Sequence, residues 1–279
     1  YPVLYLQDGQ NLFNPLAPYG DWAIDKSMEK LAEEGHNDVI IIAIDHGNEE
    51  RVSEYLPYYH PRFGEGKGTF YIQFMIEKLI PYINSHYRTL TDFHHTGIGG
   101  SSMGGLISYH AGLMNPGVFG KMMIFSPSLW ISKMIFEHTK TFDPLNQSRI
   151  YLYAGGQESK QHLPNAKRLE AIIREKMVKG HQIDFKFSVN LEAQHAEVYW
   201  REEFSNSKAL LWVSNVTFVV VLLSLFELPR TFCLSRPRLY LLLLLPQSTL
   251  ACPTSAPMPS PLNPTGGLPP GTRPPTLGT

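Results

Sequence analysis

Short apolar runs separated by helix-length segments constrain the fold of this chain most strongly. Residues 38–44 read DVIIIAI, a β-branched run without polar alternation, which is typical of a strand buried on both faces of a parallel sheet. Residues 2–6 (PVLYL) form a second apolar run that ends at a turn. Helical spacing of apolar residues follows in 21–35 and in 69–86, and Pro81 is expected to kink the second of these helices.

The same alternation continues to about residue 213. The expected elements are strand 95–100, helix 103–114, strand 121–125, strand 149–154, helix 164–179, strand 183–189 and a helix from about 197. Strands separated by helices imply βαβ units, and therefore an α/β fold with a doubly wound, mainly parallel sheet and helices on both faces. Ligands bind such sheets beyond the carboxyl ends of the strands, so functional residues are expected directly after strands.

Composition excludes several classes of protein. The chain has 279 residues, of which 43% are hydrophobic and 18% charged, so a sizeable core is possible and global disorder is excluded. A formal net charge of -1 provides no basic field for nucleic acid. Both cysteines, Cys233 and Cys252, come late, which excludes a disulfide framework or an all-cysteine zinc site in roughly the first 230 residues.

A serine within the glycine-rich segment 99–105 is the strongest catalytic candidate. The segment reads GGSSMGG and contains G-x-S-x-G at residues 100–104, after a predicted strand and before a predicted helix. This context defines a nucleophile elbow, a sharp turn that holds Ser102 in a strained conformation with its hydroxyl exposed above the sheet. The alternative is a tight or phosphate-binding turn, but the lysine of a P-loop is missing and the spacing does not fit G-x-G-x-x-G.

A nucleophilic serine needs a base and an acid, which in α/β hydrolases follow it in the order acid, histidine. Glu158 follows the strand RIYLYAG, and His195 lies on the loop after the strand IDFKFSV. We therefore predict Glu158 as the acid and His195 as the base. His46, which also follows a strand, is the alternative base, and Glu192 and Asp184 are the alternative acids.

Two backbone N–H groups are needed to stabilise an oxyanion. One is expected at Met103, directly after the nucleophile, and the other at Gln10 in the loop 8–11 after the first strand. The alternative for that loop is an ordinary turn. His110, within the helix after the elbow, is expected to be structural, and Glu197 to support the histidine loop.

Several motifs, in order, resemble one known family. The segments YPVLYLQDGQNLF, GIGGSSMGG, FSPSLW, YLYAGGQES and QHAEVYWREEF resemble the "Putative esterase" family of α/β hydrolases, which includes esterase D, feruloyl, acetyl-xylan and enterochelin esterases, and mycolyltransferases. The resemblance covers residues 1 to about 213. It implies the nucleophile at Ser102, the acid at Glu158, the base at His195, and oxyanion donors at Gln10 and Met103, with no metal or cofactor.

The chain departs from the family pattern in two places. Asp8-Gly9 stands where many relatives have His-Gly, although a DGQNLF form occurs in a branch that resembles bacterial carbohydrate- or siderophore-linked esterases. The chain also begins directly at a core strand, where relatives carry one or two earlier strands, so an N-terminally truncated domain is expected.

The resemblance implies a serine esterase that cleaves a small-molecule carboxylic ester through an acyl-enzyme, with carbohydrate- or siderophore-linked esters as candidate substrates. An acyltransferase with an alcohol acceptor and a non-catalytic carbohydrate-binding domain are the alternatives. Trp130, after the strand MMIFS, and Arg51 and Tyr55, in the loop over roughly 46–68, are candidate substrate-binding residues. For each, packing is the competing interpretation.

The end of the chain differs in composition from the rest. Residues 209–226 carry no charge and reach the lower limit of a membrane span. After Glu227 the sequence has no Lys, Asp or Glu and becomes rich in proline. We interpret residues 214–279 as a disordered or non-native tail, from a frameshift or read-through, in preference to a membrane anchor. A cytoplasmic location is favoured over a periplasmic or secreted one.

Overall fold

The computed structural model describes residues 1–34, 39–144, 146–211 and 239–240. The predicted tail (214–279), apart from residues 239–240, and most of the apolar segment 209–226 lie outside the described residues. Among the described helices, none is long and apolar enough to cross a bilayer.

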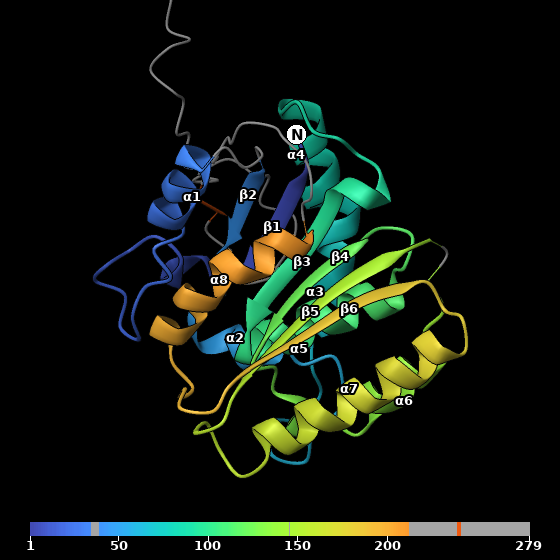
Figure 1. Ribbon diagram of the computed structural model, residues 1–279. Helices are drawn as coiled ribbons and strands as arrows, with labels where there is room; N and C mark the ends of the chain where they lie inside the picture. Colours follow the sequence, from blue (N-terminus) through green and yellow to red (C-terminus); the bar gives the residue numbers. More distant parts are fainter. Residues whose placement is uncertain (35–38, 145, 212–238, 241–279) are drawn as a thin grey trace, which may run out of the picture. The chain divides into compact units, whose positions relative to one another are not determined.

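A parallel sheet forms the centre of the domain (Figure 1). Its strand order is β6-β5-β4-β3-β1-β2-β7 among the described residues. The six longer strands are mutually parallel, and the two-residue β7 is antiparallel to β2. The strands are β1 (Val3–Gln7), β2 (Ile40–Ile44), β3 (Thr96–Ser101), β4 (Lys121–Phe125), β5 (Ser148–Gly155), β6 (Ile183–Asn190) and β7 (Leu239–Tyr240). This topology confirms the predicted doubly wound α/β-hydrolase fold.

Helices cover both faces of the sheet (Figure 1). One face carries α1 (Ile24–Glu33) and α8 (Glu197–Leu211), which contact each other. The other face carries α3 (Gly68–Phe74), α4 (Ile80–His86), α5 (Ser102–Met114), α6 (Met134–Thr141) and α7 (His162–Val178). Since β1 and β2 are buried on both sides, their sequences are almost entirely apolar, which explains the runs without polar alternation.

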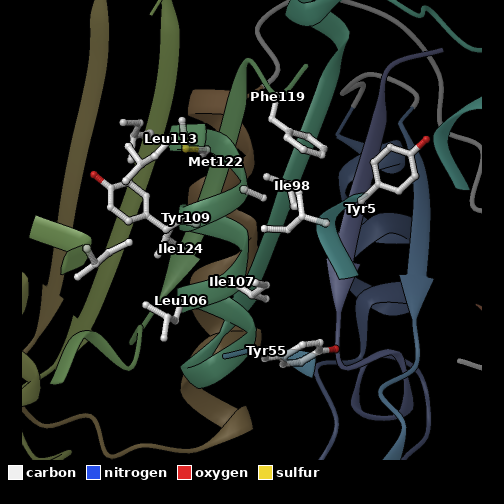
Figure 2. Close-up of a cluster of buried hydrophobic side chains, with 14 of the residues drawn as sticks. Tyr5, Tyr55, Ile98, Leu106, Ile107, Tyr109, Leu113, Phe119, Met122 and Ile124 are labelled. Atoms are coloured by element: carbon white, nitrogen blue, oxygen red, sulfur yellow. The ribbon is translucent and has the colours of Figure 1, made fainter. Parts of the chain in front are cut away.

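Two hydrophobic cores lie on opposite faces of the sheet. Along β2, Ile40, Ile42 and Ile44 belong to the core under α3–α7, whereas Ile41 and Ala43 face α1 and α8. Figure 2 shows the larger core, where side chains of α5 pack on β3 and β4. Each fully buried aliphatic side chain contributes about 1.5–3 kcal/mol, so these cores hold the strand ends, and the site built on them, in fixed positions.

The structure differs from the predicted elements in three places. Between α3 and α4 lies a π-helical segment, η3 (Met75–Leu79), in which Ile80 N–H donates to Met75 C=O, five residues earlier. This wider turn comes directly before Pro81, which has no backbone N–H to donate to a regular helix. The predicted loop over 46–68 contains a short helix, α2 (Arg51–Glu54). α6 (Met134–Thr141) was not predicted. Both missed helices span about two turns or fewer, too short to show clear periodicity.

Candidate active site

The turn between β3 and α5 has the geometry of a nucleophile elbow. β3 ends at Ser101, α5 begins at Ser102, and Ser102 has a φ of 56°, a left-handed conformation that costs a non-glycine residue about 1–3 kcal/mol. The helix passes very close to the strands: a Cβ added at Gly104 would lie 2.9 Å from Gln7 Cβ and from Asp8 Oδ2. Glycine at position 104 therefore permits the close approach that the sharp turn requires.

A chain of hydrogen bonds leads from this serine to a buried carboxylate. His195 Nε2 lies 3.0 Å from Ser102 Oγ, and His195 Nδ1 lies 3.2 Å from Glu158 Oε2. Glu158 comes directly after β5, and His195 lies between β6 and α8. The Glu158 side chain is completely buried, whereas that of His195 is 29% exposed. The structure thus brings together the three residues that the sequence singled out, at the carboxyl ends of the strands.

The surroundings of Glu158 favour its ionised form. Burial alone would raise its pKa, but hydrogen bonds from His195, from the Ser126 hydroxyl and from Gly155 N–H (2.7 Å) outweigh burial and lower the pKa. An ionised carboxylate only accepts hydrogen bonds. It therefore fixes the proton of His195 on Nδ1 and leaves the lone pair of Nε2 directed at Ser102.

Ser126 and Trp200 complete the hydrogen bonding of this carboxylate. Ser126, directly after β4, has a φ of 44°; its hydroxyl donates to Glu158 and accepts from Trp200 Nε1 at 2.9 Å. The Trp200 ring also meets the His195 ring edge-on, with centroids 5.0 Å apart. The role of Ser126 was not predicted from the sequence, although its position directly after a strand was an available signal.

A second histidine, His162, packs against His195. The two ring centroids are 4.7 Å apart, and His162 Nδ1 lies 2.7 Å from Ser159 Oγ. His162 Nε2 is buried 3.9 Å from Glu158 Oε2 and has no hydrogen-bond partner among the described residues. Burial, followed by the nearby His195, lowers the pKa of His162. The sequence showed no signal for this neighbour, because a histidine at a helix start is usually solvated.

The same cluster contains the best arrangement for a cation among the described residues. Potential ligand atoms of Glu158, His162 and His195 all lie within 4.8 Å of one another. In the present arrangement, the Glu158 and His195 atoms are engaged with each other and with Ser102. A cation at this position would compete with these hydrogen bonds.

The predicted oxyanion donors lie on two adjacent segments. Gln10 belongs to a 3₁₀ turn, η1 (Gly9–Asn11), after β1, and Met103 lies in the first turn of α5, where backbone N–H groups lack helical partners. The Gln10 side chain holds the neighbouring loop: its Nε2 donates to His46 C=O (2.8 Å), and its Oε1 accepts from His46 N–H (3.2 Å). Only the backbone N–H of Gln10 is then a candidate donor.

Two predicted substrate-binding residues make internal contacts. Tyr55 is fully buried, and its hydroxyl accepts from Asp8 N–H at 3.2 Å; its ring lies in the core shown in Figure 2. The prediction that Tyr55 contacts substrate is therefore wrong. Arg51 forms a two-point ion pair with the buried Asp8 carboxylate, at 2.7 and 2.8 Å, and its side chain is 26% exposed. Contact of Arg51 with substrate stays a prediction.

Trp130 lies on a short turn, η5 (Leu129–Ile131), at the rim of a cleft. It is 41% exposed and lines an open cavity of about 300 Å³. The other lining residues come from η5, α6 and the start of α7: Leu129, Lys133, Phe136, Lys160, Gln161, Pro164, Asn165 and Arg168. Trp130 thus remains a candidate for contact with substrate.

The alternative acids and bases make other contacts. Glu192 is exposed on its turn, and Asp184 Oδ2 lies 3.5 Å from Arg149 Nε. The Nδ1 atom of His46 accepts from Asn48 N–H at 2.9 Å. His110 hydrogen-bonds the Tyr58 hydroxyl through Nδ1 at 2.9 Å, consistent with the predicted structural role. Glu197 Oε1 accepts from Asn11 at 3.4 Å, and thereby links the helix after the histidine loop to the loop after β1.

Known proteins share both the sequence and the fold. The family described as "Putative esterase" matches residues 1–211. The uncharacterized protein YbbA of Bacillus subtilis is 26% identical over 229 residues, which cover 77% of this chain and 87% of YbbA. The BES protein from Bacillus cereus has a similar structure (TM-score 0.63, 22% identity, 77% of this chain and 84% of that chain). The structure of the enterobactin esterase FES from Shigella flexneri is also similar (TM-score 0.59, 20% identity, covering 76% of this chain and 52% of that chain).

These two similar structures, at 22% and 20% identity, establish the α/β-hydrolase fold. The family match covers most of the chain and nearly all of its described part. The chain therefore belongs to the "Putative esterase" family and is a carboxylic ester hydrolase.

Proposed function

We propose that Ser102, His195 and Glu158 form the catalytic triad of this esterase. The observation that carries the proposal is the continuous hydrogen-bonded chain from Ser102 Oγ through His195 to the buried carboxylate, at 3.0 and 3.2 Å. The left-handed backbone of Ser102 is a second, independent support, because such strain in a non-glycine residue clusters at functional sites.

Acylation begins with His195 Nε2 as the base. It accepts the proton of Ser102 Oγ while the oxygen forms a bond to the ester carbonyl carbon. The resulting oxyanion accepts hydrogen bonds from the backbone N–H groups of Met103 and Gln10. The bond from carbon to the alcohol oxygen then breaks, and His195 returns the proton to the leaving alcohol.

Deacylation repeats these steps with water. A water molecule gives a proton to His195 Nε2 and attacks the acyl-enzyme carbonyl; the bond to Ser102 breaks, and the proton returns to the serine oxygen. Glu158 stays ionised throughout and stabilises the imidazolium through Nδ1. Ser126 and Gly155 hold the carboxylate in place by donating to its other oxygen.

We further propose that the substrate is a small carbohydrate- or siderophore-linked ester. An enterobactin esterase and a siderophore hydrolase are among the proteins of similar structure. We also propose that residues 1–213 are the catalytic unit and that 214–279 contribute no residue to the site. This division predicts equal kcat/KM for the full chain and for residues 1–213, measured with 4-nitrophenyl acetate.

The decisive experiment compares two neighbouring serines in the full chain. Ser102→Ala is expected to lower kcat for 4-nitrophenyl acetate by at least about a thousandfold and to abolish labelling by a fluorophosphonate. Ser101→Ala, one residue earlier and buried in β3, should fold and keep both activity and labelling. Equal activity of the Ser102→Ala variant and the wild-type protein, with circular dichroism unchanged, would remove Ser102 from the mechanism.

A further inference from the structure

The cleft beside Trp130 is positively charged. Three of its lining residues are cations: Lys133 just before α6, Lys160 just before α7, and Arg168 within α7. Of the described residues that line the cavity, none is an aspartate or a glutamate. The other lining residues are the exposed Trp130 and Pro164, the buried Leu129 and Phe136, and the amides Gln161 and Asn165. This combination favours an anionic ligand with an apolar arm.

The cations of the cleft are not neutralised by neighbouring acids. Within the described part of the chain, none of the three makes an ion pair, whereas other cations of α6 and α7 do: Lys140 pairs with Glu137 at 2.9 Å and Arg174 with Glu170 at 2.8 Å. Arg168 instead stacks on the Phe136 ring, 4.0 Å from its centroid. Within the described part of the chain, the cleft therefore presents positive charge without paired acids beside the exposed Trp130 ring.

The cleft adjoins the proposed catalytic residues from two sides. Leu129 follows Ser128, whose Oγ lies 3.4 Å from Ser102 Oγ. Lys160 lies between Glu158 and His162 in the sequence, and both of these residues contact His195. Since consecutive Cα atoms are about 3.8 Å apart, the near end of the cleft lies within roughly 10 Å of the nucleophile. An ester bond placed at Ser102 can thus extend an arm into it.

We propose that this cleft binds a negatively charged group, a carboxylate or a phosphate, at the far end of the ester substrate. The inference rests on the proposed function, since it places the ester bond at Ser102. The exposed Trp130 ring would pack along the apolar arm, while Lys133, Lys160 and Arg168 bind the anion. Exposed charge pairs are individually weak, so we expect the three together to favour an anionic ester by about tenfold, mainly through KM.

Matched esters test this preference on the full chain. Either part of the ester could enter the cleft, so two pairs are needed: mono-4-nitrophenyl suberate against its neutral amide, and 8-acetoxyoctanoate against its neutral amide. 8-Acetoxyoctyl phosphate distinguishes a phosphate site from a carboxylate site. We expect kcat/KM to be about tenfold higher for the anionic member of at least one pair, and the difference to shrink in high salt.

Variants assign the preference to the cleft. Lys160→Gln and Arg168→Gln should each lower kcat/KM for the anionic ester severalfold and leave that for 4-nitrophenyl acetate unchanged. Lys167→Gln, on the same helix but not lining the cleft, should change neither. The inference fails if the wild-type protein hydrolyses charged and neutral esters equally, or if the preference survives when all three cations are neutralised.

A binding measurement separates this inference from the proposed mechanism. Calorimetry on the Ser102→Ala protein should show tighter binding of mono-4-nitrophenyl suberate than of its amide. Lys160→Gln in that background should reduce the difference, and neutralising all three cations should remove it. If 4-nitrophenyl acetate is cleaved through Ser102 without any charge preference in either assay, only the anion site is wrong. If the anion binds but Ser102→Ala remains active, the triad is wrong.

Discussion

Replacing Glu158 by glutamine should disable the proposed base by changing the tautomer of His195. Glutamine keeps the shape of glutamate but puts an NH₂ donor in place of one oxygen. At the Oε1 position this donor would face Gly155 N–H, now 2.7 Å away, and leave a buried N–H unpaired at a cost of about 1–3 kcal/mol. The NH₂ group is therefore expected at the Oε2 position, facing His195 Nδ1.

The consequence for catalysis follows from hydrogen-bond polarity. When NH₂ faces Nδ1, that nitrogen must accept, so the proton of the neutral imidazole moves to Nε2. Nε2 then donates to Ser102 Oγ and cannot take its proton. The same acid-to-amide change in the serine protease triad lowers kcat by about 10⁴, and we expect a loss of that order here, with KM nearly unchanged.

The assay is steady-state hydrolysis of 4-nitrophenyl acetate at neutral pH, with folding checked by thermal unfolding. Glu192→Gln is the matched control, since Glu192 is exposed on the loop that carries His195 and its charge can be removed without affecting the triad. A folded Glu158→Gln protein that keeps more than about a tenth of wild-type kcat would refute the tautomer argument. Equal losses in both variants would assign the effect to loop charge.

Three further outcomes are expected. Tyr55→Phe should lower the free energy of unfolding by about 1–3 kcal/mol, because Asp8 N–H loses its buried acceptor, while KM for any ester stays constant; a raised KM would restore Tyr55 to the substrate site. His162→Phe should keep kcat within about threefold of the wild-type value, because a ring still packs against His195. His162→Ala should lower kcat about tenfold, because the His195 ring loses that packing and is held less firmly. Equal kcat values for the two variants would show that ring packing does not position His195. Burial lowers the pKa of His110 from 6.5 to about 4, so as the pH falls the unfolded chain takes up this proton before the folded protein does. The free energy of unfolding should therefore decrease between pH 6.5 and 4, by on the order of 3 kcal/mol. Denaturant titration of His110→Gln should show a smaller decrease over that range.

The sequence was sufficient for the fold and for the arrangement of the candidate triad. A strand such as β2 (Ile40–Ile44) is apolar because both of its faces are covered, and this burial is visible in the sequence as an unbroken apolar run rich in β-branched residues. The elbow was predictable because a sharp strand-to-helix turn demands glycines at fixed positions around Ser102. Once a parallel sheet is assumed, Glu158 and His195 must meet at the same edge as the serine.

The remaining parts of the site depend on tertiary contacts that leave no local pattern. Ser126 contacts Glu158 across 32 positions of the chain and Trp200 across 74, and His162 approaches His195 through packing alone. The wrong prediction for Tyr55 has the same origin. An aromatic residue in a loop is expected at the surface, but Tyr55 is buried, and its hydroxyl accepts the hydrogen bond of Asp8 N–H.

Backbone strain at the strand ends connects these observations. Three of the described non-glycine residues with positive φ, Asp8, Ser102 and Ser126, directly follow the adjacent strands β1, β3 and β4. Glycine would adopt these conformations without strain, but it would remove the carboxylate that holds Arg51, the proposed nucleophile, and the hydroxyl that holds Glu158. Each strained residue keeps a polar side chain that its neighbours use. This concentration of local cost at one edge of the sheet is expected where side-chain chemistry, and not stability, determines the residue.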